Sequence, residues 1–216
     1  MLEKMDKFFE ARLDGYDAHM LTNIDSAEEF YPFTADCLPK EPGCCVLDLG
    51  CGTGLELEYY FRQNPGAKIV GIDLSRGMLD ALQAKFVDRD LRLICGSYFD
   101  VPLDEGCFDG AVSVESLHHF TQESKIFLYA KLRNALKPGG YFILTDYFAL
   151  SDAEEESFFA ELTNLKAEQG ITDDAFYHFD TPLTVQHEMD ALWTAGFSSV
   201  EVLGNWGATH TIKAQK

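Results

Sequence analysis

Short apolar runs alternate with longer stretches of helical spacing along this chain. Five runs have the length and composition of strands, and they cover residues 46–49, 68–72, 91–95, 110–114 and 141–145. The runs are almost continuously apolar instead of alternating with polar residues. This pattern is typical of strands that are buried on both faces, as in a parallel sheet.

Between these runs, apolar residues recur at spacings of three and four, which predicts amphipathic helices. One such stripe follows Ser75, which has the residue type of an N-cap, and another covers residues 126–136. The second stripe ends just before Pro138 and Gly139, residues that stop helices. Alternating strands and helices predict an α/β fold with a doubly wound, mostly parallel sheet.

Further helical segments flank this core on both sides. Residues 2–20 and 27–38 predict two helices, and Ser151 with Glu154 has the spacing of a capping box before a third. A loop is expected at 169–184, a helix at 184–195, and a hairpin of 199–203 with 209–214 around residues 204–207. We therefore expect one domain over residues 1–216. Its expected parts are a helical lid (1–40), a binding core (41–150), a helical segment on the substrate side (151–197) and the last strands (198–216).

The net charge of the chain disfavours some classes of binding partner. Seventeen basic residues against 36 acidic ones give a net charge of −19, which disfavours extended contact with nucleic acid or anionic lipid. No apolar run reaches eighteen residues and Met1–Glu10 lacks an apolar leader core, so neither a membrane span nor a secretory signal is expected. The six cysteines lack CxxC spacing, which favours a reducing, cytoplasmic compartment.

The most informative segment is a strand that runs into a turn rich in glycine. Gly50, Gly52 and Gly54 follow the run 46–49, and a helical stretch begins directly after them. Glycine permits a tight turn and lets a ligand approach the backbone. The next strand ends at Asp73, nineteen residues beyond Gly54, where a carboxylate can accept hydrogen bonds from both ribose hydroxyls of an adenosine.

The residues around this turn differ from those of two other nucleotide-binding motifs. No Gly-Lys-Ser/Thr follows the turn, so it is not a phosphate loop, and Leu55 stands where a dinucleotide-binding motif has its third glycine. Asp48 would repel a pyrophosphate and suits a ligand that carries positive charge. A nucleotide dehydrogenase is therefore disfavoured.

These segments together resemble the class I S-adenosylmethionine (SAM)-dependent methyltransferases. The run 48–54 (DLGCGTG) is similar to their motif I, Asp73 to their acidic ribose-binding residue, 108–120 to their fourth strand with its loop, and 137–141 to the turn before their fifth strand. The resemblance implies a seven-stranded Rossmann-like sheet. It also implies SAM as the cofactor and S-adenosylhomocysteine as the product.

The same resemblance implies which residues contact SAM. The glycine turn would line the methionine part, Asp48 would lie near its amino group, and Asp73 would hold the ribose. The lid would contribute aromatic side chains. The full set of expected contacts is Tyr16, Tyr31, Asp48, Gly50, Cys51, Gly52, Gly54, Asp73, Leu74, Met78, Ser97, Tyr98 and Glu115. Ser97 stands where many relatives carry an acid that accepts from the adenine amino group.

Methyl transfer from a sulfonium mainly requires alignment, and a general base is needed only when the nucleophile is protonated. His119 and Tyr147 are the catalytic candidates, with His118 and Asp146 beside them at the ends of strands four and five. Each of these residues could instead serve packing or helix capping. No metal site is expected, because His178, His187 and His210 lack paired ligand spacing.

Two other functions stay open beside methyl transfer to a small acceptor. The run 9–12 (FEAR) and the run 192–197 (LWTAGF) resemble bacterial enzymes that carboxymethylate wobble uridine in tRNA, but Ala191 stands where those enzymes have an arginine for the extra carboxylate. The high negative charge also disfavours an RNA substrate. A module that binds SAM without turnover would keep the same motifs. The sequence leaves the acceptor and the oligomeric state open.

Overall fold

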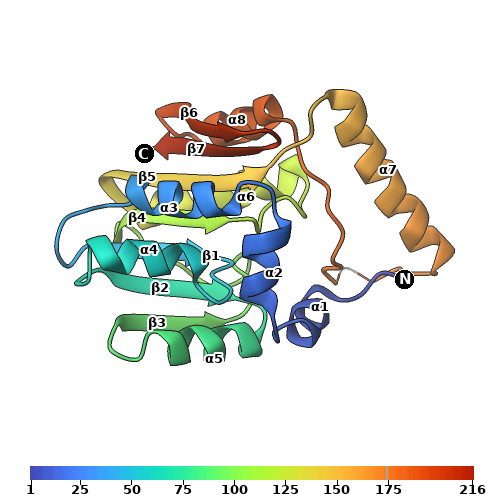
Figure 1. Ribbon diagram of the computed structural model, residues 1–216. Helices are drawn as coiled ribbons and strands as arrows, with labels where there is room; N and C mark the ends of the chain where they lie inside the picture. The colour runs from blue at the N-terminus through green and yellow to red at the C-terminus, as the bar shows by residue number, and fades with distance from the viewer. Residues whose placement is uncertain (174) are drawn as a thin grey trace.

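The computed structural model describes residues 1–173 and 175–216; Asp174, in the expected loop, lies outside the described residues. Seven strands form one sheet in the order β3-β2-β1-β4-β5-β7-β6 (Figure 1). The first five are parallel, whereas β7 is antiparallel to both β5 and β6. The strands are β1 (Cys45–Leu49), β2 (Lys68–Asp73), β3 (Asp90–Cys95), β4 (Phe108–Val114), β5 (Leu136–Tyr147), β6 (Ser199–Trp206) and β7 (Thr209–Gln215). This is the expected Rossmann-like, doubly wound sheet.

Helices cover both faces of the sheet. The helices are α1 (Met5–Ala11), α2 (Tyr16–Asn23), α3 (Ala27–Cys37), α4 (Leu55–Gln63), α5 (Arg76–Lys85), α6 (Gln122–Ala135), α7 (Asp152–Glu168) and α8 (Val185–Thr194). In Figure 1, α3, α4 and α5 lie in front of the sheet, and α6 and α8 lie behind it.

Neighbouring strand residues pack into different cores, which explains the continuous apolar runs. Val46 belongs to the core under α3, α4 and α5, while Leu47 belongs to the core under α6 and α8. In the same way, Ile143 faces the first core, and Phe142 and Leu144 face the second. Because successive side chains of a strand point to opposite faces, a strand between two helical layers must be apolar throughout.

The N-terminal segment differs from the expectation of one helix over residues 2–20. Helix α1 ends at Ala11, α2 begins at Tyr16, and Gly15 between them has φ +83°. A residue in this left-handed conformation cannot continue an α-helix. The predicted segments 27–38 and 184–195 correspond to α3 and α8, so these predictions are confirmed.

The expected capping groups are present at two helices, and two strand boundaries differ. The Ser75 hydroxyl accepts from the Met78 amide, and the Ser151 hydroxyl accepts from the Glu154 amide. Strand β5 already begins at Leu136, and the turn between β6 and β7 lies at residues 207–208 instead of 204–207. Both strands therefore run further than the apolar runs indicated.

Helix α7 stands apart from the rest of the chain (Figure 1). None of its seventeen residues, all of which the structure describes, is buried. Its first turn is anchored by Glu155, which accepts from the Thr184 amide at 2.6 Å and contacts His187 Nδ1 at 2.9 Å. The chain then returns from α7 to the carboxyl ends of the strands.

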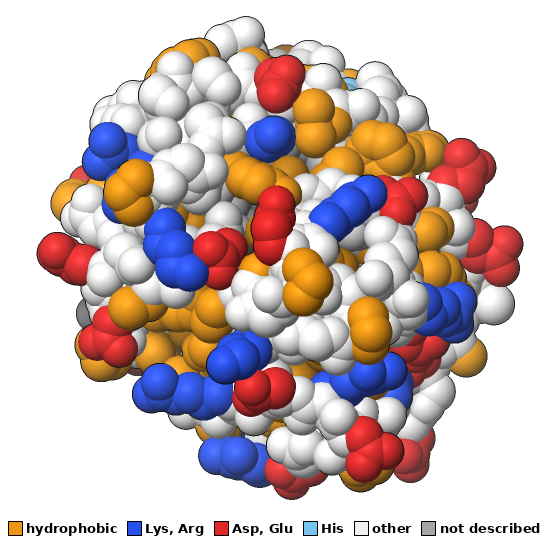
Figure 2. All heavy atoms as spheres, turned by 90° about the vertical axis from the view of Figure 1, so that its left-hand side faces the viewer, with side chains coloured by type: hydrophobic (Ala, Val, Ile, Leu, Met, Phe, Trp, Pro, Cys, Tyr) orange, Lys and Arg blue, Asp and Glu red, His pale blue; other side chains and the backbone are white. Residues whose placement is uncertain are grey.

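The two ends of the strands are covered by different parts of the molecule. Helices α1 and α2 lie over the carboxyl ends of β1, β2 and β4, at the right of Figure 1. At the opposite end, basic side chains are interspersed with acidic ones (Figure 2).

Within the described part of the chain, no helix combines the length and the apolar character needed to cross a membrane.

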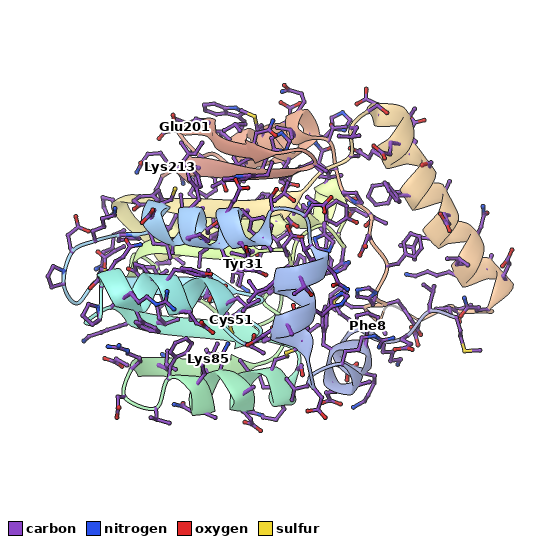
Figure 3. The ribbon with its side chains drawn as sticks, viewed as in Figure 1. Phe8, Tyr31, Cys51, Lys85, Glu201 and Lys213 are labelled. Carbon is purple, nitrogen blue, oxygen red and sulfur yellow. The ribbon has the colours of Figure 1, made fainter. Side chains whose placement is uncertain are left out.

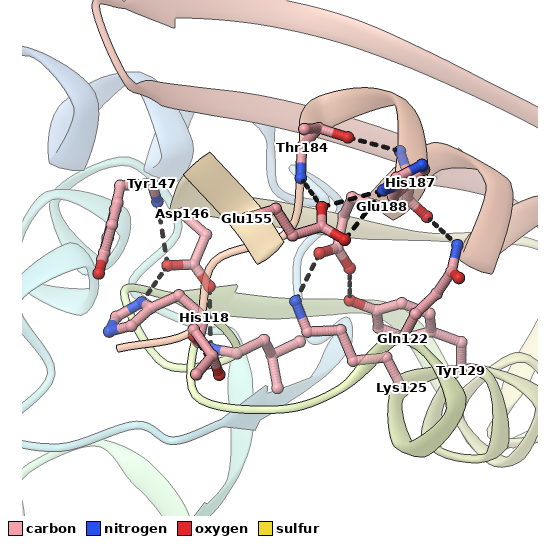
Figure 4. A network of polar contacts seen from close by, with 12 residues as sticks. His118, Gln122, Lys125, Tyr129, Asp146, Tyr147, Glu155, Thr184, His187 and Glu188 are labelled. Atoms are coloured by element: carbon pink, nitrogen blue, oxygen red, sulfur yellow. Dashed lines mark hydrogen bonds and ion pairs between the residues drawn. The ribbon is translucent and has the colours of Figure 1, made fainter. Parts of the chain in front are cut away.

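A buried ion pair joins α6 to α8 behind the sheet (Figure 4). Lys125 Nζ donates to Glu188 Oε2 at 2.5 Å, and the Tyr129 hydroxyl donates to the other oxygen of the same carboxylate. The side chains of Lys125 and Glu188 are 2% and 0% exposed. Each charge therefore depends on the other for its compensation.

Breaking this pair from one side should destabilise the fold strongly. We expect Lys125→Met to lower the free energy of unfolding by about 3–5 kcal/mol, because the Glu188 carboxylate stays buried without its cation. The matched control is the double variant Lys125→Met with Glu188→Leu, which removes both charges and should cost less. Urea denaturation followed by circular dichroism measures both, and a double variant as unstable as the single one would contradict the interpretation.

Candidate functional site

The glycine turn between β1 and α4 is held against its neighbours by backbone hydrogen bonds. The Gly50 amide donates to the Ile72 carbonyl at 2.8 Å, and the Gly54 amide donates to the Cys51 carbonyl at 2.8 Å. Gly50, Gly52 and Gly54 all have positive φ. A Cβ on Gly50 would lie 2.0 Å from the Ser116 Oγ. Glycine is therefore required at position 50 for both its conformation and its close approach to the loop after β4.

Asp73 ties this turn to the end of β2. One carboxylate oxygen accepts from the Gly52 amide at 2.9 Å, and the other accepts from the Ser75 amide at 2.8 Å. Burial raises the pKa of Asp73, although these amides favour its charged form. Each oxygen keeps a second lone pair for a ligand.

A first cavity of about 50 Å³ opens beside this turn. Its walls come from the glycine turn, the end of β2, the start of α5, the loop after β4, and helices α1 and α2. The lining residues are Met5, Phe9, Tyr16, Gly50, Gly52, Asp73, Leu74, Met78, Tyr98, Val114, Glu115, Ser116 and His119. Eight of the thirteen expected ligand contacts are among them.

The other five expected contacts are not among the residues that line the first cavity. Asp48 is buried beneath the turn and only 1% exposed. Cys51, at the start of the turn (Figure 3), packs its sulfur against Gly71. Gly54 faces α4 and α5, and Ser97 accepts from the Phe99 amide within its own loop.

Tyr31 lies on α3 (Figure 3), where it is 3% exposed and packs against Phe30 with ring centroids 4.7 Å apart. Burial, and then the nearby Tyr16, raise the pKa of the Tyr31 hydroxyl well above its usual value. The aromatic side chain that reaches the first cavity from the N-terminal segment is Tyr16. Tyr31 thus packs within the helical layer, and its expected contact with SAM stays a prediction.

Two carboxyl groups share the buried space beneath the glycine turn. Burial and the adjacent Glu56 raise the pKa of Asp48 well above its usual range, and burial also raises the pKa of Glu56. Asp48 Oδ2 and Glu56 Oε1 have no hydrogen-bond partner among the described residues. The turn therefore lies over a buried carboxyl pair whose ionised form a nearby positive charge would favour.

This pair should make folding stability depend on pH. Both pKa values are raised in the folded protein, so stability is lost as the pH rises above the ordinary carboxyl range, near 4. We expect Glu56→Gln to raise the melting temperature of the protein alone, and to raise it more at pH 8 than at pH 5.5. The exposed Glu161→Gln serves as the control and should change little at either pH. An equal effect of Glu56→Gln at both pH values would contradict this account.

A second, larger cavity of about 890 Å³ opens to solvent next to the first. The two cavities share Phe9, Tyr16, Glu115 and His119 as common walls. The remaining lining residues include Phe8, Arg12, His19, His118, Tyr147, His178 and Asp180. Both catalytic candidates of the sequence, His119 and Tyr147, therefore face this cavity.

A buried histidine–aspartate pair forms part of this wall (Figure 4). His118 Nδ1 donates to Asp146 Oδ1 at 2.5 Å, while Asp146 Oδ2 accepts from the Leu117 amide at 2.8 Å. Burial opposes a charge on His118, but the Asp146 carboxylate outweighs it and raises the pKa of His118 to about 9. Asp146 thus fixes the orientation of His118 and of the loop after β4.

Asp180 reaches the same place from the segment that returns from α7. Its Oδ1 lies 3.2 Å from His119 Nδ1 and 3.6 Å from His118 Nε2. Burial and the neighbouring His118 lower the pKa of His119. Burial likewise lowers the pKa of His178, to about 4. The wall of the second cavity thus combines one basic imidazole with two that favour the neutral form.

Helices α1 and α2 are held over both cavities by contacts with distant segments. The Met5 amide donates to the Phe176 carbonyl at 2.9 Å, and Phe8 (Figure 3) stacks on His178 with ring centroids 3.5 Å apart. On α2, Asp17 accepts from Thr53 Oγ1 at 2.5 Å and from Lys85 at 2.7 Å.

Sequence reasoning missed part of both walls. Met5, Phe9, Ser116 and Asp180 line the cavities. Phe9 and Ser116 stand within the runs 9–12 and 108–120 but were given no role there, and no motif marks Met5 or Asp180. The single signal available was the cluster of aromatic and histidine residues at 176–180, which stands in a segment of broken helical pattern.

Replacement of Gly50 tests how closely the turn approaches the loop after β4. We expect Gly50→Ala to lower the free energy of unfolding by about 2–4 kcal/mol, through left-handed strain and the clash with Ser116. Gly139→Ala is the matched control, because Gly139 has φ +80° but open space at its Cβ. It should cost only the conformational part, about 1–2 kcal/mol. Equal losses in urea denaturation would show that the contact with Ser116 carries no cost.

Comparison with known proteins gives a consistent result. A family model described as a methyltransferase domain matches residues 47–144. The malonyl-[acyl-carrier protein] O-methyltransferase of Herminiimonas arsenicoxydans is 30% identical over 167 residues, which cover 77% of this chain and 57% of that protein. The cypemycin N-terminal methyltransferase of a Streptomyces species is 38% identical over 100 residues, or 45% of this chain and 40% of that protein. The chain therefore spans about half the length of these curated relatives.

The fold also matches solved structures. A structure described as a SAM-dependent methyltransferase from Mesorhizobium loti aligns with a TM-score of 0.63 at 19% sequence identity, covering 86% of this chain and 96% of that one. At this level of identity the match concerns the fold. It agrees with the sheet order and the antiparallel β7 described above.

Proposed function

Because the chain belongs to the class I SAM-dependent methyltransferases, we propose that it binds SAM in the first cavity and methylates a small acceptor in the second. The observation that carries this proposal is the wall common to both cavities. Phe9, Tyr16, Glu115 and His119 line each of them. A donor on one side of this wall and an acceptor on the other would meet there.

The lining of the first cavity fits SAM in its chemistry. Bound SAM supplies a methyl group activated by its sulfonium. Gly50 and Gly52 let it approach the backbone, Asp73 accepts from the ribose, and Leu74 and Met78 cover the adenine. Burial disfavours the charged forms of Asp48, Glu56 and Glu115, and a ligand of positive charge would offset this by favouring the ionised carboxylates.

The chain's own contribution to the reaction is alignment and exclusion of water. Helices α1 and α2 cover the junction of the cavities. His119 lines both cavities and Tyr147 lines the second, so these side chains would orient the acceptor atom toward the methyl group. Asp146 acts through His118, whose ring it holds by the hydrogen bond from Nδ1. Asp146 is thus a positioning residue.

The acidic character of the chain favours a small acceptor over RNA. The net charge is −19, and an RNA backbone would be repelled by most of the surface. One curated relative is named for an acyl-carrier-protein-bound malonyl group, and it supports an acceptor with a small reacting end. We place this activity in the cytoplasm on the basis of the reduced cysteines.

Loss of the Asp73 carboxylate should weaken SAM binding. We expect Asp73→Ala to raise the dissociation constant by the equivalent of about 1–3 kcal/mol, because charge-assisted hydrogen bonds to the ribose are removed. Calorimetric titration with SAM and with S-adenosylhomocysteine measures the change. Asp80→Ala, an exposed carboxylate on α5, is the control and should bind as the unchanged protein does. No heat from the unchanged protein with either compound would refute the proposed function.

Turnover distinguishes an enzyme from a module that only binds SAM. Release of S-adenosylhomocysteine should rise when a suitable acceptor is added from a panel of small carboxylates, phenols and amines, and tRNA should give no rise. A rise with tRNA alone would favour the RNA-modifying alternative. SAM binding with no turnover on any panel member would favour the binding module.

A further inference from the structure

Three potential metal ligands meet on the wall of the second cavity, although they are far apart in sequence. His118 and His119 follow β4, and Asp180 lies on the segment that returns from α7. Asp180 Oδ1 is 3.6 Å from His118 Nε2 and 3.2 Å from His119 Nδ1, and one atom of each residue lies within 4.8 Å of the others. Ligands about 2.0–2.1 Å from a tetrahedral zinc ion are about 3.3 Å apart. The spacing of these atoms therefore matches one coordination sphere.

The hydrogen bond on the far side of His118 supports this interpretation. Because the Asp146 carboxylate accepts from His118 Nδ1, the second ring nitrogen, Nε2, is the one that faces Asp180, and a metal ion would bind there in exchange for the Nε2 proton. Asp146 is itself fixed by the Leu117 amide. A carboxylate that orients a histidine through its second nitrogen is the common support of a metal-binding imidazole.

Two carboxylate oxygens in this cluster lack a hydrogen-bond donor. Asp180 Oδ1 and Glu115 Oε1 are buried without a hydrogen-bond partner among the residues that the structure describes. The proton on His119 Nδ1 would have to be shared between Asp180 and the Phe179 carbonyl, which is 3.2 Å away. The carboxylates of Asp146 and Asp180 flank the two imidazoles, and the Glu115 carboxyl group lies beside them. A divalent cation would compensate this charge.

We propose that His118, His119 and Asp180 bind a divalent first-row transition-metal ion, of the class represented by Zn²⁺. Two imidazoles and one carboxylate suit Zn²⁺, Co²⁺ or Fe²⁺, whereas Mg²⁺ and Ca²⁺ prefer oxygen ligands. Three protein ligands leave at least one coordination position free, and it would face the second cavity. On the basis of the proposed function, the acceptor would then carry an oxygen or nitrogen that coordinates the ion, which would lower the pKa of that group.

Cobalt titration of the chelator-treated full chain tests this site. We expect a visible absorption band typical of low-coordinate Co²⁺ that saturates at one ion per chain and disappears on addition of Zn²⁺. His119→Ala and Asp180→Asn should each abolish the band. Asp146→Asn, which removes the support of His118, should weaken binding by about 10- to 100-fold.

The control is His187→Ala, since His187 contacts Glu155 outside both cavities, and this variant should keep the full band. Melting curves of every variant establish that each is folded, and Asp180→Asn keeps the size of the side chain. Absence of a saturable band in the unchanged protein would overturn the metal site. A band that survives in folded His119→Ala and Asp180→Asn would also overturn it.

Calorimetry with SAM separates this inference from the proposed function. The metal site fails alone if chelator-treated protein binds SAM but gives no cobalt band. The proposed function fails alone if the band forms as expected but neither SAM nor S-adenosylhomocysteine binds.

Discussion

Burial of both faces of the sheet is the constraint on which the rest of this structure depends. Helices α3, α4 and α5 cover one face, and α6 and α8 cover the other, so the parallel strands have only their ends free. The carboxyl ends of β1, β2, β4 and β5 lie at one edge, where each strand runs into a loop with polar residues. The glycine turn, Asp73, the histidines after β4 and Asp146 therefore come together without any direct sequence relation between them.

Buried carboxylates organise this edge in two different ways. Asp73 and Asp146 accept hydrogen bonds from backbone amides and so fix the loops that surround the cavities. Asp48 and Glu56 face each other without such compensation, and burial raises the pKa of both. The first pair gives the site its shape. The second pair leaves it with a local electrostatic preference for a cationic ligand, at a cost to stability at neutral pH.

The cover over the two cavities is assembled from opposite ends of the described chain. Backbone hydrogen bonds and the stacking of Phe8 on His178 join the N-terminal segment to the segment after α7. Asp17 then ties α2 to the glycine turn and to α5. Helices α1 and α2 are therefore held in place by a small number of polar and aromatic contacts.

The sequence by itself determined the parallel strands, the helices between them, and the glycine turn with Asp73. These features follow from local periodicity and from residues close together in the chain, and a side chain buried on either face leaves a clear apolar signature. The tertiary structure alone decided where the N-terminal helix breaks, at Gly15. It also decided that Tyr31, Cys51 and Asp48 are buried and that Asp180 lies beside His118. Each of these depends on contacts across many residues, and the spacing of residues along a chain carries no information about which distant segment will pack against it.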